Sequence, residues 1–138
     1  MAANKTRERM TGIELKMPAA AIINPGDPLA FGPAAGPALV GVANDGQNLT
    51  TKPPYYSNSG YLSLDCEGSF NLQVTAVTAI TPGTLVYLHP GTTDATTGIS
   101  YGNTLNNTAT GGILVGIAET SLATGTAAVR VTLKDCVS

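Results

Sequence analysis

The stretch ITPGTLVYLH, residues 80–89, shows the unit from which the fold is built. Its proline fixes φ and its glycine accepts the positive φ of a type II turn, so residues 80–83 are predicted to form a tight turn. The β-branched and aromatic residues that follow predict a strand over residues 84–89. The stretch INPG at residues 23–26 repeats the turn and leads into a second predicted strand, Pro28–Phe31.

A second feature follows each turn in the same order. LVGVA at Leu39–Ala43 is matched by LVGIA at residues 114–118, and each of these predicted strands contains a glycine, Gly41 or Gly116. A glycine inside a strand predicts a bulge, a tight bend or the close approach of another backbone. Replacing either glycine with valine is therefore expected to damage folding or assembly.

A third feature completes the repeat. LSL at residues 62–64 resembles VTL at residues 131–133, and both lie near a cysteine. The second copy of the repeat is longer, and its extra residues fall between Gly91 and Gly112. Because that segment consists mostly of Thr, Gly and Asn, we expect it to be an exposed, mobile insertion.

Further period-2 alternation predicts strands over residues 70–75 and 129–134. Residues 85–89 carry apolar side chains on both faces, as a buried central strand does. With seven or eight short strands, the predicted fold class is all-β: a small β-barrel or sandwich with a pseudo-duplicated unit. This single β domain occupies residues 18–138, after an extended N-terminal arm over residues 1–17.

Composition excludes several functions. The chain has 138 residues, of which 12% are charged, with a net charge of −2 and a pI of about 5.1. It has no basic stripe to neutralise phosphates, so no nucleic-acid partner is expected. No apolar run reaches the roughly 20 residues that cross a bilayer, so no membrane partner is expected. No apolar segment follows the polar N-terminus as in a signal peptide.

The arm contrasts with the acidic body. It carries Lys5, Arg7 and Arg9, and then Ile13, Leu15 and Met17 alternate with charged residues before Pro18. This alternation predicts a short strand with one apolar face. The strand either pairs with its own sheet or adds to the sheet of a partner, where backbone hydrogen bonds supply the affinity.

Catalytic constellations are missing from the sequence. His89 is the only histidine and has no triad partners, so we interpret it as a structural or solvent-exposed residue. Cys66 and Cys136 lie far apart and form no metal motif; we interpret both as buried free thiols, with a disulfide formed outside a reducing cytosol as the alternative. We therefore expect no enzyme, no cofactor and no metal, but a binding or structural module.

The order of these motifs resembles that of the capsid cement (decoration) proteins of tailed bacteriophages. The resemblance covers roughly residues 20–134 and rests on INPGD, LVGVA, GSFNL at residues 68–72, PGTLVY at residues 82–87, and the closing AVRVTL. The long arm and the enlarged loop over residues 44–60 depart from the family pattern, so nothing is inferred for them from the resemblance.

The resemblance implies a protein without catalysis. Family members are β-rich and commonly trimeric, made in the host cytoplasm and bound to the outer capsid surface of the virion. They bind the major capsid protein of the mature shell at three-fold and quasi-three-fold positions and stabilise contacts between its subunits. In this setting the arm is the candidate attachment element. Ile13, Leu15 and Met17 would add a strand to a shell edge, while Lys5, Arg7 and Arg9 would meet acidic shell surface.

Two adjacent tyrosines suggest an alternative. Tyr55 and Tyr56 lie in the 44–60 loop, where they are either interface anchors or a cover for the end of the barrel. With Tyr61 and Tyr101 they are also the candidates for a sugar-binding platform. The alternative function is thus a carbohydrate-binding β module of a phage fibre or adhesin.

Overall fold

The computed structural model describes residues 12–16, 21–32, 39–44, 46 and 61–134, and within these ranges it contains strands and no helix. The strands are β1 (Gly12–Lys16), β2 (Pro28–Phe31), β3 (Leu39–Ala43), β4 (Tyr61–Asp65), β5 (Ser69–Ala76), β6 (Leu85–His89), β7 (Thr92–Thr93), β8 (Ile99–Tyr101), β9 (Thr104–Asn106), β10 (Ile113–Ala118) and β11 (Gly125–Leu133). The predicted all-β fold class is confirmed.

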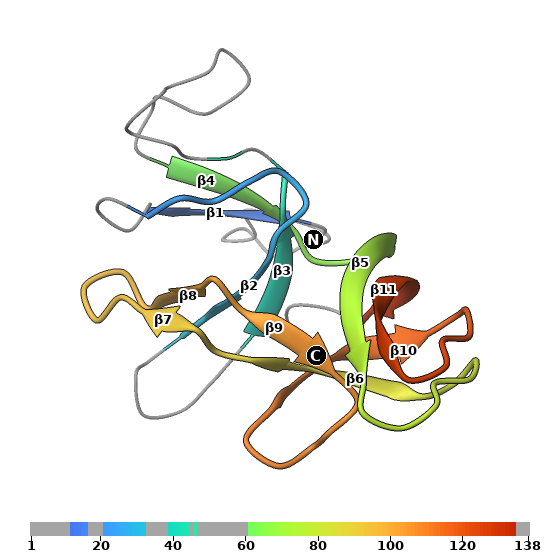
Figure 1. The fold of residues 1–138 in the computed structure, drawn as a ribbon. Coiled ribbons are helices and arrows are strands. Elements are labelled where there is room, and N and C mark those ends of the chain that lie inside the picture. Colours follow the sequence, from blue (N-terminus) through green and yellow to red (C-terminus); the bar gives the residue numbers. More distant parts are fainter. Residues whose placement is uncertain (1–11, 17–20, 33–38, 45, 47–60, 135–138) are drawn as a thin grey trace, which may run out of the picture.

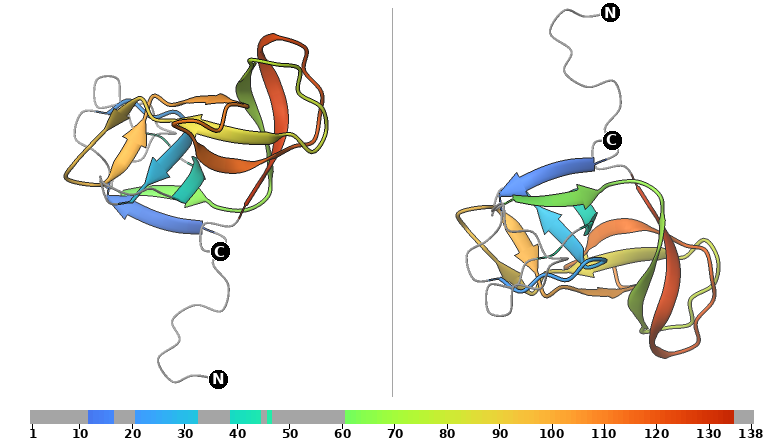
Figure 2. Two further views of the ribbon diagram at one scale, coloured as in Figure 1. Left: turned by 90° about the horizontal axis from the view of Figure 1, so that it is seen from below. Right: turned by 90° about the horizontal axis from the view of Figure 1, so that it is seen from above.

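The strands form a closed barrel and a separate six-stranded sheet (Figure 1). The barrel has the order β10-β11-β5-β9-β6, and the sheet has the order β1-β4-β3-β2-β8-β7. The chain passes from the sheet into the barrel where β4 leads into β5, and Figure 2 shows the two bodies side by side.

The internal repeat is confirmed by equivalent backbone hydrogen bonds. In the first copy the Gly26 N–H donates to the Ala43 carbonyl (2.7 Å), and in the second the Gly83 N–H donates to the Ala118 carbonyl (2.8 Å). Both turn glycines have positive φ, +91° and +97°, as the type II prediction requires. The N–H of each turn glycine thus bonds to the last residue of the strand that carries the LVG motif shared by the two copies.

The third feature of the repeat is displaced by two residues from its predicted alignment. Ala43 pairs with Leu64, and the equivalent Ala118 pairs with Val131. Leu64 therefore corresponds to Val131 and not to Leu133. A shift of two residues leaves every side chain on the same face of its strand, so alternation in the sequence does not distinguish the two alignments.

Two apolar clusters form the core, one inside the barrel and one on the sheet. The barrel interior is filled by fully buried side chains from its strands, among them Val74, Val86, Leu88, Val129 and Val131. The second cluster lies on the sheet and consists of Ala21, Ile23, Leu29, Ala43, Leu64 and Ile99. Ala30, Val40 and Val42, on the other face of β2 and β3, belong to the barrel cluster, so this face of the sheet packs against the barrel.

The segment between Gly91 and Gly112 is not the exposed, mobile insertion that its composition predicts. Its strand β8 pairs with β2, and its strand β9 closes the barrel between β5 and β6. Ile99 and Leu105, two apolar residues in a polar background, are 0% and 2% exposed. Burial of these two side chains, each worth about 1.5–3 kcal/mol, anchors the segment in both bodies.

The burial of β6 also differs from prediction. Val86 and Leu88 are buried in the barrel, but Leu85, on the other face, is 43% exposed, so β6 is not buried on both sides.

The state of Cys66 differs from prediction as well. Cys66 is buried and disulfide-bonded, so the free-thiol interpretation is wrong for this residue. Cys136, the other cysteine of the sequence, lies outside the described residues.

Candidate interaction surfaces

The predicted arm strand is β1, which pairs with its own sheet. It lies antiparallel to β4, with Glu14 opposite Ser63, at the edge of the sheet. Leu15 is half-buried and packs against the sheet cluster. Of the other arm residues proposed for binding, Ile13 lies in β1, whereas Lys5, Arg7, Arg9 and Met17 lie outside the described residues.

The open edge of β1 exposes defined backbone groups. The Asn44 N–H donates to the Ser63 carbonyl (2.8 Å), so Ser63 directs its backbone groups toward β3. In antiparallel pairing alternate residues direct these groups to opposite sides, so Glu14, opposite Ser63, directs its own away from β4. The described residues provide no strand on that side, which leaves the Glu14 N–H and C=O available to a further strand.

The tyrosine pair predicted as interface anchors, Tyr55 and Tyr56, lies outside the described residues. Tyr61 lies in β4, and Tyr101 is partly buried against the sheet cluster. Tyr101 therefore has a packing role, which removes part of its ring from any exposed sugar platform.

The two repeat glycines lie where another backbone approaches closely. A Cβ at Gly116 would lie 1.9 Å from the Thr132 carbonyl oxygen, next to a register shift in the pairing of β10 with β6. A Cβ at Gly41 would lie 3.1 Å from the Leu64 Cβ and 3.2 Å from the Asp65 carbonyl oxygen. Side chains are thus excluded sterically at Gly116 and only crowded at Gly41.

An exposed apolar pair marks the outside of the barrel. Leu85 on β6 pairs with Ile117 on β10, and the side chains are 43% and 46% exposed. The repeat places Val42 of the sheet at the position of Ile117, and Val42 is buried in the barrel cluster. The second copy of the repeat therefore exposes a strand face whose first-copy counterpart is covered.

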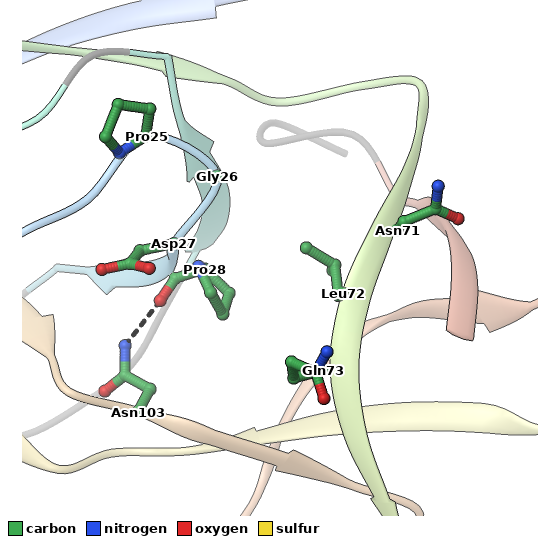
Figure 3. A pocket seen from close by; sticks show the side chains of 8 residues that line it. All are labelled: Pro25, Gly26, Asp27, Pro28, Asn71, Leu72, Gln73 and Asn103. Carbon is green, nitrogen blue, oxygen red and sulfur yellow. Dashed lines mark hydrogen bonds between the residues drawn. The ribbon is translucent and has the colours of Figure 1, made fainter. Parts of the chain in front are cut away.

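A cleft of about 320 Å³ lies between the turn before β2 and the strand β5 (Figure 3). Residues 25–28 form one wall of the cleft and residues 71–73 form the other, and Asn103 forms its floor. The Asn103 amide Nδ2 donates to the carbonyls of Pro28 (2.9 Å) and Ser100 (2.8 Å), which fixes the floor to the sheet.

Part of the β5 edge in this cleft is unpaired. On one side β5 pairs with β11 along its whole length, whereas on the other β9 pairs with it only at Thr75. The Leu133 N–H donates to the Gly68 carbonyl (2.9 Å), so even-numbered positions of β5 direct their backbone groups toward β11. Asn71 and Gln73 therefore direct theirs to the side of β9 and the cleft.

Asp27 gives the cleft its charge, as the one ionisable residue among its described lining. Its carboxylate Oδ2 accepts a hydrogen bond from the Asn24 N–H (2.9 Å). Burial raises the pKa of Asp27, and the hydrogen bond from Asn24 partly opposes this effect. Among the described residues no lysine or arginine forms an ion pair with it. In Figure 3 the carboxylate points away from β5, so it closes its own turn more than it faces the open space of the cleft.

A second carboxylate joins three strand ends on the barrel. Glu119 accepts hydrogen bonds from the hydroxyls of Thr132 and Ser69, and its Oε2 lies 3.9 Å from the Arg130 Nε. The pKa of Glu119 is lowered mainly by the hydrogen bond from the Thr132 hydroxyl, and next by the hydrogen bond from Ser69. Similarly, Thr97 lowers the pKa of Asp94 in the turn between β7 and β8.

Glu119 is expected to make the protein less stable in acid. Its pKa is lower when folded than its ordinary 4.5, so its contribution to stability is present above that value and is lost as pH falls through the folded pKa. The melting temperature of the wild type should therefore fall more steeply from pH 6 to pH 3 than that of Glu119→Gln. Parallel melting curves for the two proteins, measured by circular dichroism, would contradict the assignment.

The described residues form no metal-binding cluster. Nowhere in the described ranges do three or more His, Cys, Asp or Glu side chains gather as metal ligands do. His89 has its Nε2 3.0 Å from the Thr108 carbonyl oxygen, within the fold. The described part of the chain also contains no helix of the length and hydrophobicity needed to span a membrane.

The fold and these surfaces define an all-β module whose candidate sites are strand edges, an apolar strand pair and a cleft. A family model described as phage cement protein matches residues 8–133. The chain belongs to the phage cement protein family, and its role is structural and associated with the virion capsid. The match includes β1, which the sequence resemblance left out. A search of curated proteins found no match, and neither did a search of solved structures.

Proposed function

We propose that the protein binds the outer surface of the mature capsid and stabilises contacts between major capsid protein subunits. It acts as a homotrimer at three-fold and quasi-three-fold positions. The observation that carries this proposal is the cement-family match over residues 8–133. The exposed pair Leu85 and Ile117 supports it, because an apolar strand face suits contact with another protein. Many modest contacts repeated over a closed shell stabilise it collectively.

In this proposal the arm attaches the protein to the shell, and the open edge of β1 is the part of the arm that binds. Strand addition along this edge would use the outward N–H and C=O of Glu14, and main-chain hydrogen bonds would supply affinity. Leu15 packs against its own domain, so in this arrangement the backbone of β1, more than the Leu15 side chain, contacts the shell. Ile13 and Met17 flank this contact in the sequence.

Glu14→Pro tests the edge, because proline removes the outward N–H that a shell strand would need. Edge strands tolerate proline where the lost N–H faces solvent, so pairing with β4 should survive. In a binding assay on undecorated capsids we expect at least a tenfold loss of affinity. Glu14→Gln, which changes only the side-chain charge, should bind as the wild type does.

Quantitative mass spectrometry of purified particles tests the proposed decoration role. A copy number close to that of the major capsid protein is expected, and a few copies per particle would reject the decoration role. Wild-type affinity of a folded Glu14→Pro variant, with a normal copy number, would reject only the β1 edge as the attachment site.

A further inference from the structure

The duplication of the chain includes the strand that precedes each Pro-Gly turn. Residues 14–16 of β1, with the sequence ELK, precede residues 71–73 of β5, with the sequence NLQ, by 57 positions. The two turns, at residues 23–26 and 80–83, are separated by the same 57 positions. The sequence therefore aligns β1 with β5 without a gap.

Backbone hydrogen bonds give β1 and β5 the same place in their copies. The carbonyls of Ser63 and Arg130 accept equivalent bonds, of 2.8 and 2.7 Å, from the residue that follows each LVG strand. Ser63 lies opposite Glu14 in the pairing of β4 with β1. Arg130 lies opposite Asn71 in the pairing of β11 with β5. Glu14 and Asn71 are thus equivalent residues, and both direct their backbone N–H and C=O away from the strand they pair with.

Neither of these two edges is fully paired within the described part of the chain. β1 ends the sheet, and β9 pairs with β5 only at Thr75, which leaves the outward groups of Asn71 and Gln73. Leu15 and Leu72, at the centres of the two segments, pack into the apolar clusters of their own copies. Outward groups on every second residue match the backbone of an extended polypeptide.

The wall of the cleft opposite β5 does not compete for such a polypeptide. Its two prolines have no N–H, and the N–H groups of Gly26 and Asp27 already donate to carbonyls of their own copy (2.7 and 3.0 Å). In Figure 3 this turn stands across an open space from residues 71–73. A strand in the cleft would therefore pair with β5 and turn its other edge toward the proline rings.

Two equivalent edges in one chain suit a partner that presents the same segment twice. The edges belong to different bodies, β1 to the sheet and β5 to the barrel (Figure 1), so two separate segments are needed to fill them. Neighbouring subunits of a shell built from one protein supply two copies of one segment. Because the β1 edge is assigned to a shell strand, its equivalence with β5 assigns the same strand to the cleft.

We infer that the β5 edge is a second acceptor for this shell segment, so that one chain binds extended strands from two neighbouring major capsid protein subunits. The inference rests on the proposed function and gives the duplication a role, since each copy of the repeat holds one subunit. Binding at the first edge brings the second segment to a high effective concentration, and the chain is released only when both strands dissociate.

Hydrogen exchange of the full-length protein, free and bound to particles, tests the second acceptor without a substitution. Measured residue by residue with mass spectrometry, the amides of Asn71 and Gln73 should exchange at least tenfold more slowly on the particle, as should that of Glu14. The Leu72 amide is the internal control, because it is directed toward β11 in the free protein and its exchange should change little. Slower exchange at Glu14 alone would overturn the inference.

Proline substitution measures what each edge contributes to binding. Asn71→Pro removes an outward N–H and leaves the pairing with β11, as Glu14→Pro does for β1 and β4. On undecorated capsids each single variant should lose at least tenfold in affinity, and the double variant should show no saturable binding. Asn71→Thr keeps the N–H and should bind as the wild type does. If Asn71→Pro does not fold, the exchange measurement on the wild type still decides.

Photo-cross-linking on coated particles identifies the occupant. Benzoylphenylalanine replaces Gln73 in one protein and Lys16, its first-copy counterpart, in another. Both should link to the same segment of the major capsid protein. Links from position 73 to another copy of this chain or to its own residues 1–11 would overturn the inference, as would wild-type affinity of a folded Asn71→Pro variant. A low copy number of the wild type on particles would instead reject the proposed function.

Discussion

Gly116→Ala is expected to lower the free energy of unfolding by about 3 kcal/mol or more, at the upper end of the cost of overpacking. The new Cβ would lie 1.9 Å from the Thr132 carbonyl oxygen and 3.0 Å from the Leu133 Cα. Both atoms are backbone of β11, which pairs with β5 from Gly125 to Thr132. Neither can rotate away as a flexible side chain would, so β10 and β11 must separate where Gly116 pairs with Leu133.

Gly41→Ala is the matched variant, because the repeat places Gly41 at the same position of the first copy. Its Cβ would meet the Leu64 Cβ and the Asp65 carbonyl at 3.1 and 3.2 Å, contacts that a shift of a few tenths of an ångström relieves. We expect a cost of about 1 kcal/mol. The exposed Ala128→Ser on β11 should leave stability unchanged and controls for handling of the variants.

Urea unfolding followed by circular dichroism measures the three variants. The expected order of midpoints is wild type and Ala128→Ser, then Gly41→Ala, then Gly116→Ala with the lowest. Failure of Gly116→Ala to fold agrees with the expected loss, and Gly41→Ala then still reports the graded effect. Equal midpoints for both glycine variants and the wild type would show that these close approaches do not limit the fold.

The repeat was predictable because its signals are local. A Pro-Gly pair determines a turn within four residues, and a glycine between β-branched residues marks a crowded position in a strand. Both signals recur in the same order in the two halves, and the structure uses them for the same hydrogen bonds. Short-range conformational preference and final structure therefore agree at both turns, residues 23–26 and residues 80–83.

Two of the wrong sequence predictions concern features that only tertiary contacts decide. The alignment of Leu64 with Val131 depends on which residue lies opposite Ala43 and Ala118, and alternation is unchanged by a two-residue shift. Between Gly91 and Gly112 composition favours a loop, yet Ile99 and Leu105 bury themselves in two different bodies. A single buried apolar residue in a strand of three residues gives too short a pattern to be recognised in sequence.

The candidate site was less predictable than the fold. The cleft joins a turn before β2, a strand edge on β5 and the loop that carries Asn103, and no sequence spacing relates these three segments. Asp27 was visible only as part of the INPGD motif, where it helps to close a turn. Leu85 and Ile117 follow the same alternation as buried strand residues, and only the barrel geometry shows that their face is open.

Reduction of the disulfide at Cys66 is expected to destabilise the protein by about 4 kcal/mol, because the unfolded chain regains the entropy that closing a loop of this length removes. Cys66 is bonded, and the sequence contains one other cysteine, Cys136. A bond within one chain thus closes a loop of about 70 residues that includes every strand of the barrel. Without it, the unfolded chain regains conformational freedom while the folded barrel gains little.

Urea unfolding with and without a thiol-free phosphine reductant measures the effect, and alkylation followed by mass spectrometry counts the thiols. We expect no free thiol before reduction, two after it, and a midpoint that falls on reduction. Cys66→Ser should reproduce the lower midpoint and be insensitive to the reductant, whereas Ser63→Ala, a nearby change without a thiol, should respond as the wild type does. Two free thiols in the native protein, or a dimer that disappears on reducing gels, would contradict a bond within one chain. Because the loop encloses every strand of the barrel while β2 and β3 of the sheet precede it, reduction should also lower protection from hydrogen exchange more in β10 and β11 than in β2 and β3.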